Sequence, residues 1–336
     1  MKNILFDKKR LYPIVLILLM FVVYKYREHK KMKLQHVYGQ TMGTTYNIKY
    51  LNDVDYKPQI DSILKEVNLS LSTYIPESEI SQFNQNGVLD IKSKYFYNVI
   101  SKSKIIFNNT NGAFDPTIMP LVNAWGFGFE NKLAIDSSLI DSLLQFVDFT
   151  KISFDKNRVE STKNGMMLDF SAIAKGYGVD VIADFLKSKK IYNYMVEVGG
   201  EIVCLGKNYE DAIWRIGIDN PNYENDTDKK LAQIVELDNI ALATSGNYRN
   251  FYLDENGVKR AHTINPVSGY PVTHSLLSVS VKAKTCMAAD GYATALMVSG
   301  FENSKKIASS TDEIEVFLIY ENDSKIETWS TSGFFN

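Results

Sequence analysis

One segment of the chain places a carboxylate and a hydroxyl one helical turn apart among apolar residues. In AADGYATALMVSG, residues 288–300, Asp290 and Thr294 are four positions apart, so a helix would point both side chains the same way. Burying two such groups without partners costs roughly 2 to 7 kcal/mol each. A carboxylate with neutral oxygens suits Mg²⁺. The alternative is structural, with Asp290 as a helix N-cap and Thr294 bonding back to helix carbonyls.

A second segment combines an acid, a lysine and two glycines at the predicted start of a helix. It reads LDFSAIAKGYGVD and covers residues 168–180. A helix N-terminus offers free N–H groups and a positive dipole end to phosphates, and Lys175 adds a mobile cation. An ordinary amphipathic helix start uses the same residue types, so this segment indicates a phosphate site only in combination with others.

Three further segments could form the walls of a binding site. RAHTINPVSGYPV (260–272) puts His262 at the end of a predicted strand, where an imidazole could be a general base near neutral pH or a solvated loop residue. NGAFDPTIMPLVNAWGFG (111–128) and QTMGTTYNIKY (40–50) mix glycines with aromatic residues and methionines. Such a mixture can form flat apolar walls around a ring system, and it also occurs in ordinary cores.

The elements that must position these segments are both helices and short strands. Periodic apolar residues predict helices at about 60–71 and 94–108, and helices are also predicted at 171–189 and 288–299. Strands are predicted at 44–51, on both sides of a turn at 155–157, and at 193–206, 214–219, 233–239, 239–245, 275–283 and 313–321. Because strands and helices do not alternate as βαβα, the predicted fold class is α+β with a largely antiparallel sheet and packed helices.

The composition restricts the classes of function. The 336 residues are 45% hydrophobic, which is enough for a sizeable core. The 37 basic and 39 acidic residues are well mixed, so no field would attract a polyanion and we expect no nucleic acid partner. Cys204 and Cys286 lie in apolar stretches and are predicted to be buried free thiols. The histidines form no HxxH or HxxxH pair, which favours a hard, oxygen-binding metal over zinc.

The N-terminus carries an apolar run from Tyr12 to Tyr24 with basic residues on both sides. Its length of about 13 residues is short of the ~20 that span a bilayer, although aromatic and basic ends could snorkel. A signal peptide has this length, but YKYREHKKMK follows without an A-x-A cleavage site. We expect residues 1–36 to be an uncleaved anchor in a bacterial inner membrane and residues 37–336 to lie on the periplasmic side. A buried helix of the folded domain is the alternative.

Nine short motifs occur in one order between about Thr41 and Gly300. They are MGTTY (42–46), LSTYIPESEISQFN (71–84), GAFDPT (112–117), WGFG (125–128), LDFSAIAKGYGVD (168–180), VEVGGEI (196–202), ATSGNYRNF (243–251), HTINPVSGYP (262–271) and ADGYATAL (289–296). Each motif alone is common. In register, the nine resemble the ApbE family, the FAD:protein FMN transferases.

The resemblance implies an extended FAD cleft with Mg²⁺ held against the pyrophosphate. Carried over by motif, the metal ligands would be the backbone carbonyl of Ala172 and the side chains of Asp290 and Thr294. The implied FAD contacts are Met42, Tyr74, Ala113, Phe114, Asp115, Asp169, Lys175 and His262, with Glu201 and Ser245 as looser candidates. In the implied reaction a Thr or Ser hydroxyl attacks the phosphorus of the FMN half and AMP leaves. Lys175 would support the charge and His262 would be the base, with Asp169 as the second candidate base.

The sequence departs from the family in two places and leaves rival functions open. The family often has two glycines where this chain has Ser171-Ala172, and we expect the small residue to preserve function. Many relatives are lipoproteins, but no cysteine follows the apolar run here. A magnesium-dependent FAD pyrophosphatase would use the same residues with water, and a flavin-binding protein without turnover is the other alternative. The family suggests a membrane redox-complex flavoprotein subunit as the acceptor.

Overall fold

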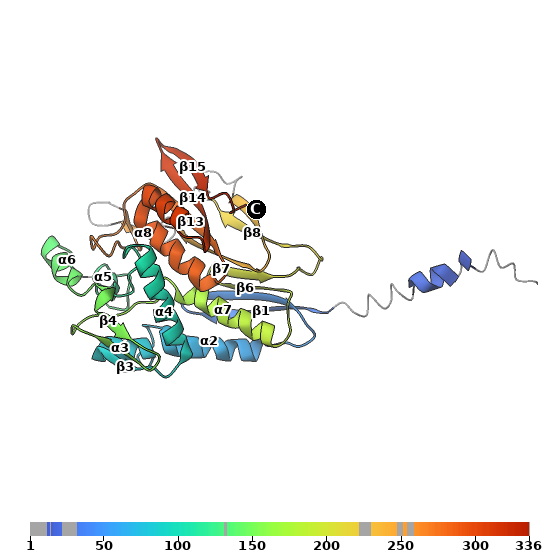
Figure 1. Ribbon diagram of the computed structural model, residues 1–336, viewed down its shortest axis with the longest axis horizontal. Helices are drawn as coiled ribbons and strands as arrows, with labels where there is room; N and C mark the ends of the chain where they lie inside the picture. Colours follow the sequence, from blue (N-terminus) through green and yellow to red (C-terminus); the bar gives the residue numbers. More distant parts are fainter. Residues whose placement is uncertain are drawn as a thin grey trace, which may run out of the picture.

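An eight-stranded antiparallel sheet forms the centre of the fold (Figure 1). The computed structural model describes residues 12–13, 15–21, 32–130, 133–221, 230–246, 251–253 and 259–335. The strand order is β1-β2-β6-β7-β10-β13-β14-β15, and every neighbouring pair is antiparallel. The strands are β1 (Leu34–Thr41), β2 (Thr44–Leu51), β6 (Tyr194–Val198), β7 (Glu201–Leu205), β10 (Ile240–Gly246), β13 (Leu276–Ala283), β14 (Ile314–Asn322) and β15 (Lys325–Ser330). The predicted α+β class is confirmed.

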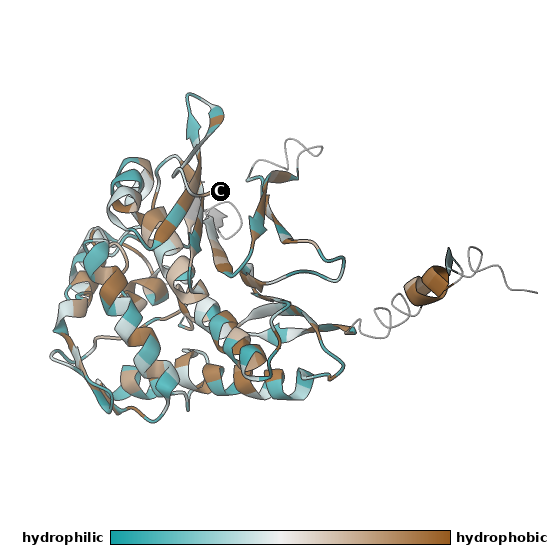
Figure 2. Cartoon of the chain, turned by 45° about the vertical axis from the view of Figure 1, so that its right-hand side comes forward, coloured by the Kyte–Doolittle hydropathy of each residue, from teal (hydrophilic) through white to brown (hydrophobic). Residues whose placement is uncertain are grey.

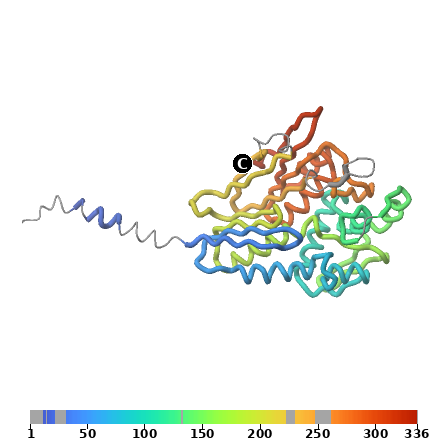
Figure 3. The backbone as a smooth tube through the Cα atoms, turned by 180° about the vertical axis from the view of Figure 1, so that it is seen from behind, coloured from blue at the N-terminus to red at the C-terminus, as the bar shows by residue number. Residues whose placement is uncertain are grey.

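Four long helices cover one face of this sheet (Figure 1). They are α2 (Lys57–Leu71), α4 (Lys94–Asn109), α7 (Ala174–Ser188) and α8 (Cys286–Ser310). The side chains of β2 alternate between the two faces of the sheet, which explains how it packs against the helices. Tyr46, Ile48 and Tyr50 are fully buried, while the residues between them are partly exposed. These side chains lie in one apolar cluster with Ile60 and Leu64 of α2. Viewed from behind, the β1–β2 hairpin runs alongside α2 (Figure 3).

The opposite face of the sheet is covered by a separate hairpin, β8 (Trp214–Asp219) with β9 (Leu231–Leu237). Trp214 and Ile218 of β8 lie in one apolar cluster with three residues of the large sheet, Met195, Ile202 and Phe317. The apolar residues next to these three in the sequence lie in the clusters that contain the helices. The successive side chains of each central strand are therefore buried on both faces, as in a three-layer arrangement.

Shorter elements complete the described fold. They are α3 (Glu79–Asn86), α5 (Met119–Ala124), α6 (Ser137–Leu144), the 3₁₀ turn η1 (Phe149–Lys151), a small sheet of β3 (Val88–Asp90), β5 (Arg158–Ser161) and β4 (Ile152–Phe154), and the hairpin of β11 (Phe251–Leu253) and β12 (Lys259–Ala261). The predicted turn at 155–157 joins β4 to β5, and β12 ends directly before His262. Both cysteines are buried free thiols, as predicted.

The structure changes several predicted boundaries. The strand-like stretch at 193–206 is the β6–β7 hairpin, which turns at Gly199 and Gly200, both with positive φ. The helix predicted from residue 171 begins at Ala174, and the helix at 288–299 extends from Cys286 to Ser310 with a break at Gly300, where φ is 72°. The pattern did not indicate β1, β15 or α3.

The N-terminal apolar run lies partly outside the described residues. Residues 12–13 and 15–21 are helical, and residues 15–21 are hydrophobic (Figure 2). Within the described parts of the chain, none of the helices combines the length and the apolar character that crossing a bilayer requires. The membrane anchor stays a prediction. The folded part begins with β1 at Leu34, ahead of the boundary predicted at residue 37.

A histidine fixes the break in α8. The Nδ1 atom of His274 accepts the backbone N–H of Leu276 at 3.3 Å, so the proton of the neutral ring is on Nε2, which donates to the Met297 carbonyl at 2.7 Å. An ideal Cβ at Gly300 would lie 3.2 Å from the His274 ring. The ring therefore links the start of β13 to the end of the first segment of α8.

Protonation of His274 is expected to destabilise the fold. Burial lowers its pKa below the ordinary 6.5, so the unfolded chain takes up the proton first as the pH falls. The free energy of unfolding should decrease as the pH drops through 6.5 and then through the lower pKa of the folded state. Urea unfolding between about pH 5 and 7.5 measures this slope. His274→Gln should have a shallower slope, and equal slopes in both proteins would contradict the assignment.

Candidate functional site

Two large cavities meet at the N-terminus of α7. The first, of about 780 Å³, lies between the β1–β2 hairpin, α2 and residues 72–75. The second, of about 650 Å³, is bounded by segments 113–118 and 199–201, by β8, and by residues of α8. Asp169, Ser171 and Lys175 line both cavities. The site is therefore a two-part cleft with a lysine and a helix N-terminus at the junction.

The structure brings together all of the site residues predicted from the sequence. Met42 and Tyr74 line the first cavity. The others line the second cavity: Ala113, Phe114, Asp115, Asp169, Ala172, Lys175, Glu201, Ser245, His262, Asp290 and Thr294. They come from both halves of the chain, so their convergence is a property of the fold. Their individual roles stay predictions.

Some lining residues were not identified from the sequence. Gly217, Ile218 and Asp219 of β8 form one wall of the second cavity. A glycine inside the strand pattern WRIGID was an available signal, because glycine in a strand often marks a close approach of another group. Asn68, in the apolar stripe of α2, lines the first cavity and was a similar signal.

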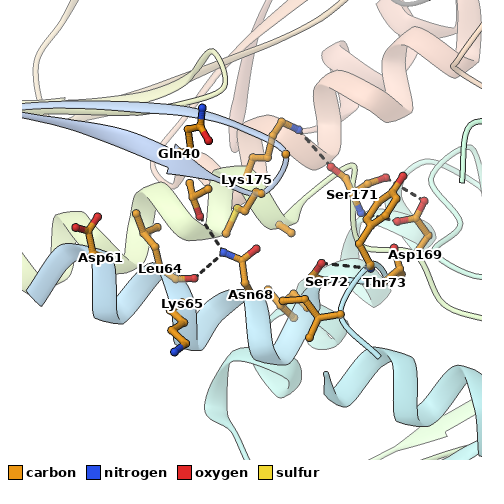
Figure 4. Close-up of a pocket in the computed structure, with 17 residues that line it drawn as sticks. Gln40, Asp61, Leu64, Lys65, Asn68, Ser72, Thr73, Asp169, Ser171 and Lys175 are labelled. Atoms are coloured by element: carbon orange, nitrogen blue, oxygen red, sulfur yellow. Dashed lines mark hydrogen bonds between the residues drawn. The ribbon is translucent and has the colours of Figure 1, made fainter. Parts of the chain in front are cut away.

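The first cavity has a polar end and an apolar wall (Figure 4). At one end Lys175 donates to the Ser171 carbonyl at 3.2 Å. Along the side, Asn68 Nδ2 donates to Thr41 Oγ1 at 2.9 Å and to the Leu64 carbonyl at 2.8 Å. These bonds tie the β1–β2 hairpin to α2 and so fix the cavity wall.

The N-terminus of α7 is capped by a side chain from another helix. Ile173 at the N-cap position makes no side-chain cap, and the Gly176 N–H donates to Asp290 Oδ2 at 2.9 Å. The alternative that Asp290 is the N-cap of its own helix is wrong, because Thr285 has that position and accepts the Ala288 N–H at 3.3 Å. Asp290 lies inside α8 and faces α7.

Opposite charges gather at the junction. Lys175 Nζ is 3.5 Å from Glu201 Oε1 and 3.8 Å from Asp290 Oδ1. Burial disfavours the charged form of Lys175. The negative charges of Asp290 and Glu201 outweigh this effect and raise the pKa of Lys175. Burial also disfavours the charged forms of the two acids. It raises the pKa of Asp290 and raises that of Glu201 to about 8, although the positive charge of Lys175 opposes both shifts. Glu201 Oε2 is buried without a hydrogen-bond partner, so this cluster can accept a further donor or cation.

Two other buried acids shape the loops around the cleft. Asp169 accepts from the backbone N–H and the hydroxyl of Ser171 at 2.8 and 2.9 Å. Asp115 accepts from the N–H and hydroxyl of Thr117 and, at 3.2 Å, from the Phe149 N–H. Burial raises the pKa of both carboxyl groups. Their bonds hold the turns that precede α7 and α5.

His262 lines the second cavity and lies directly after β12. Its ring is half-buried and contacts Phe127 edge to face, with centroids 6.4 Å apart. An imidazole in this position can exchange a proton with a ligand in the cavity.

The predicted metal ligands fit a hard cation. Ala172, Asp290 and Thr294 all line the second cavity. The Gly176 N–H donates to Asp290, not to the carbonyl of Ala172 four residues earlier, which leaves that carbonyl for a ligand. Among the residues that the structure describes, no group of three His, Cys, Asp or Glu could hold a metal ion. The three predicted ligands would supply neutral oxygens with one carboxylate, a set that suits Mg²⁺.

The fold brings two cavities together at a lysine and a helix N-terminus, an arrangement that can accommodate an extended, phosphate-bearing ligand. The sequence profile of the ApbE family matches residues 42–318, and the chain belongs to this family.

Relatives of known name cover nearly the whole chain. The FAD:protein FMN transferase of Vibrio cholerae is 39% identical over 310 residues, with 89% of this chain and 91% of that protein covered. The FAD:protein FMN transferase of Haemophilus influenzae is 38% identical, with 91% and 92% covered. Among solved structures, the flavin transferase ApbE from Vibrio cholerae superposes with a TM-score of 0.83 at 37% identity, covering 90% of this chain and 98% of that one. The apo flavinyl transferase ApbE of Pseudomonas stutzeri gives 0.81 at 31% identity, with 91% and 98% covered.

Proposed function

We propose that this chain transfers FMN from FAD to a Thr or Ser hydroxyl of another protein, with Mg²⁺ as cofactor. The names of its relatives support flavin transfer. The observation that carries the proposal is the meeting of two cavities at Lys175. FAD is two ring-bearing halves joined by a pyrophosphate, so its halves match the two cavities and its pyrophosphate matches the lysine and the N-terminus of α7.

The proposed step exchanges a phosphoanhydride bond of FAD for a phosphoester bond to the acceptor. The acceptor oxygen bonds to the phosphorus of the FMN half, the bond from that phosphorus to the bridging oxygen breaks, and AMP departs with the bridging oxygen. Lys175 counters negative charge on the pyrophosphate, and His262 takes the hydroxyl proton. Mg²⁺, held by Ala172, Asp290 and Thr294, would supply further charge stabilisation. The protein otherwise contributes alignment of the two reactants.

Mass spectrometry of an acceptor tests this function. A flavoprotein domain known to carry FMN on Thr or Ser would be incubated with the full chain, FAD and Mg²⁺. We expect the acceptor to gain the mass of one FMN and AMP to appear in equal amount, both abolished by EDTA. Free FMN and AMP with unmodified acceptor would instead support FAD hydrolysis, and binding of FAD without AMP would support a flavin-binding protein.

Replacing His262 is expected to remove the proton acceptor. His262→Ala should lower the transfer rate by about 10² to 10⁴-fold, the usual contribution of a general base. FAD should still bind to the variant. His36→Ala is the control, because His36 is exposed on β1 and contacts Asn47. Wild-type transfer by His262→Ala would assign the base elsewhere, with Asp169 the next candidate.

A membrane location is a further proposal. It is supported by the apolar run from Tyr12 to Tyr24 with its basic flanks. A membrane redox-complex subunit would be a suitable acceptor at that location. The chain produced in bacteria should sediment with inner membranes and be digested by protease added to spheroplasts. Recovery in the soluble fraction of washed cells would reject the anchor.

A further inference from the structure

The N-terminal halves of α7 and α8 cap each other. Asp290 of α8 accepts the Gly176 N–H of α7 at 2.9 Å. In return, Asp180 of α7 accepts the N–H groups of Cys286 and Met287, the first two residues of α8, at 2.8 and 2.9 Å. A carboxylate from the other helix therefore satisfies one free N-terminal donor of α7 and two of α8.

The two caps are mechanically linked because the helices touch closely between them. An ideal Cβ at Gly176 would lie 2.3 Å from the Cys286 carbonyl oxygen and 2.7 Å from Asp290 Cβ. No side chain separates the backbones of α7 and α8 at this point. A small displacement of the first turn of α8 would therefore also move Asp290. Thr285 caps only the Ala288 N–H, so the first two donors of α8 depend on Asp180.

We propose that Asp180 is a positioning residue that holds the first turn of α8 against α7 and thereby places Asp290 to bind Mg²⁺. This rests on the proposed function, in which Asp290 is a metal ligand. Asp180 does not line either cavity. Its effect passes through the backbone of Cys286 and Met287, one turn before Asp290. Supporting groups of this kind typically change metal affinity by 10 to 100-fold.

The environment of Asp180 agrees with a role inside the protein. Burial raises its pKa to about 7, and the two backbone N–H groups partly oppose that shift. Asp184 lies one turn further along α7 and is exposed. Its side chain is 78% exposed and forms an ion pair with Lys187, at 3.6 Å. The two aspartates therefore form a matched pair for substitution on one helix.

The test compares Asp180→Asn and Asp180→Ala with Asp184→Asn in the full chain. Affinity for Mn²⁺, as a spectroscopic substitute for Mg²⁺, would be measured by water-proton relaxation in the presence of FAD, beside the Mg²⁺ dependence of flavin transfer. Asp180→Ala should weaken Mn²⁺ and Mg²⁺ binding by about tenfold or more. At saturating Mg²⁺ its kcat and its KM for FAD should return to within about twofold of wild type.

Asparagine keeps one acceptor oxygen and should restore part of the metal affinity, while Asp184→Asn should behave as wild type. Lower kcat at saturating metal with an unchanged metal affinity would overturn the proposal and leave Asp180 a general structural residue. If Asp180→Ala does not fold, wild-type Mn²⁺ affinity in a folded Asp180→Asn would overturn it too. Water-proton relaxation reports metal binding without any turnover. Absence of flavin transfer by the wild type would therefore reject the proposed function without deciding whether Asp180 positions the metal ligand.

Discussion

Asp290→Asn is expected to remain folded and to lose flavin transfer. The asparagine carbonyl can still accept the Gly176 N–H, so the cap of α7 is retained. The negative charge that would bind Mg²⁺ and that faces Lys175 is lost. We expect the rate to fall by about a hundredfold or more, because a metal supplies several kcal/mol of charge stabilisation and about 1.4 kcal/mol corresponds to a factor of ten. Acceptor mass spectrometry with increasing Mg²⁺ measures this.

Asp290→Ala separates the two roles of the side chain. It removes the cap as well as the charge, so it should also lower the free energy of unfolding by about 1 kcal/mol or more, whereas the asparagine variant should not. Thr294→Val tests the second ligand without disturbing the cap, and it should raise the Mg²⁺ requirement. A fully active Asp290→Asn at wild-type Mg²⁺ would reject Asp290 as a metal ligand.

Gly176→Ala is expected to destabilise the protein strongly despite being a favourable change for an isolated helix. The new methyl would lie 2.3 Å from the backbone oxygen of Cys286, which cannot move away as a flexible side chain can. The helices must separate, and such overpacking costs about 1 to 3 kcal/mol or more. The separation would also carry Asp290 away from Lys175, so activity should fall at every Mg²⁺ concentration. Urea unfolding and transfer assays measure the two effects.

Gly178→Ala is the matched control on the same helix. Its methyl would lie 2.8 Å from the terminal carbon of Met42, the flexible end of a side chain that can rotate away. The gain in helix propensity of about 1 kcal/mol should offset this contact. The stability of Gly178→Ala should therefore stay within about 1 kcal/mol of wild type. Equal losses in the two variants would show that contact with a backbone oxygen is not the decisive factor.

The sequence predicted those helices and strands in which apolar residues recur at regular spacing over a short stretch of chain. The stripe on α2 and the alternation in β2 each depend on a few consecutive residues that face one core. The strand β1 escaped prediction because its sequence, LQHVYGQT, alternates weakly and only two of its residues are buried. Pairing with β2 over its whole length, and not hydrophobic content, makes it a strand.

The motif resemblance grouped residues that lie together in the structure, but it did not predict their geometry. The motif resemblance selected residues that all line the cleft. The spacing of Asp290 and Thr294 left the N-cap alternative open, because a local pattern cannot show which helix receives a carboxylate. Only the packing of α7 against α8 shows that Asp290 caps Gly176. The division of the cleft into two cavities was unpredictable for the same reason, since its walls come from segments spread between Gln40 and Val298.

The shared wall between the cavities has a consequence for product release. In the proposed reaction the central bond of FAD would break beside Lys175, and its two halves would be left in different cavities, because Lys175 lines both. The departing nucleotide then has no need to pass the half that stays, which can remain aligned with the incoming protein. Such a division suits a reaction in which one fragment diffuses away as a small molecule while the other is handed to a macromolecule.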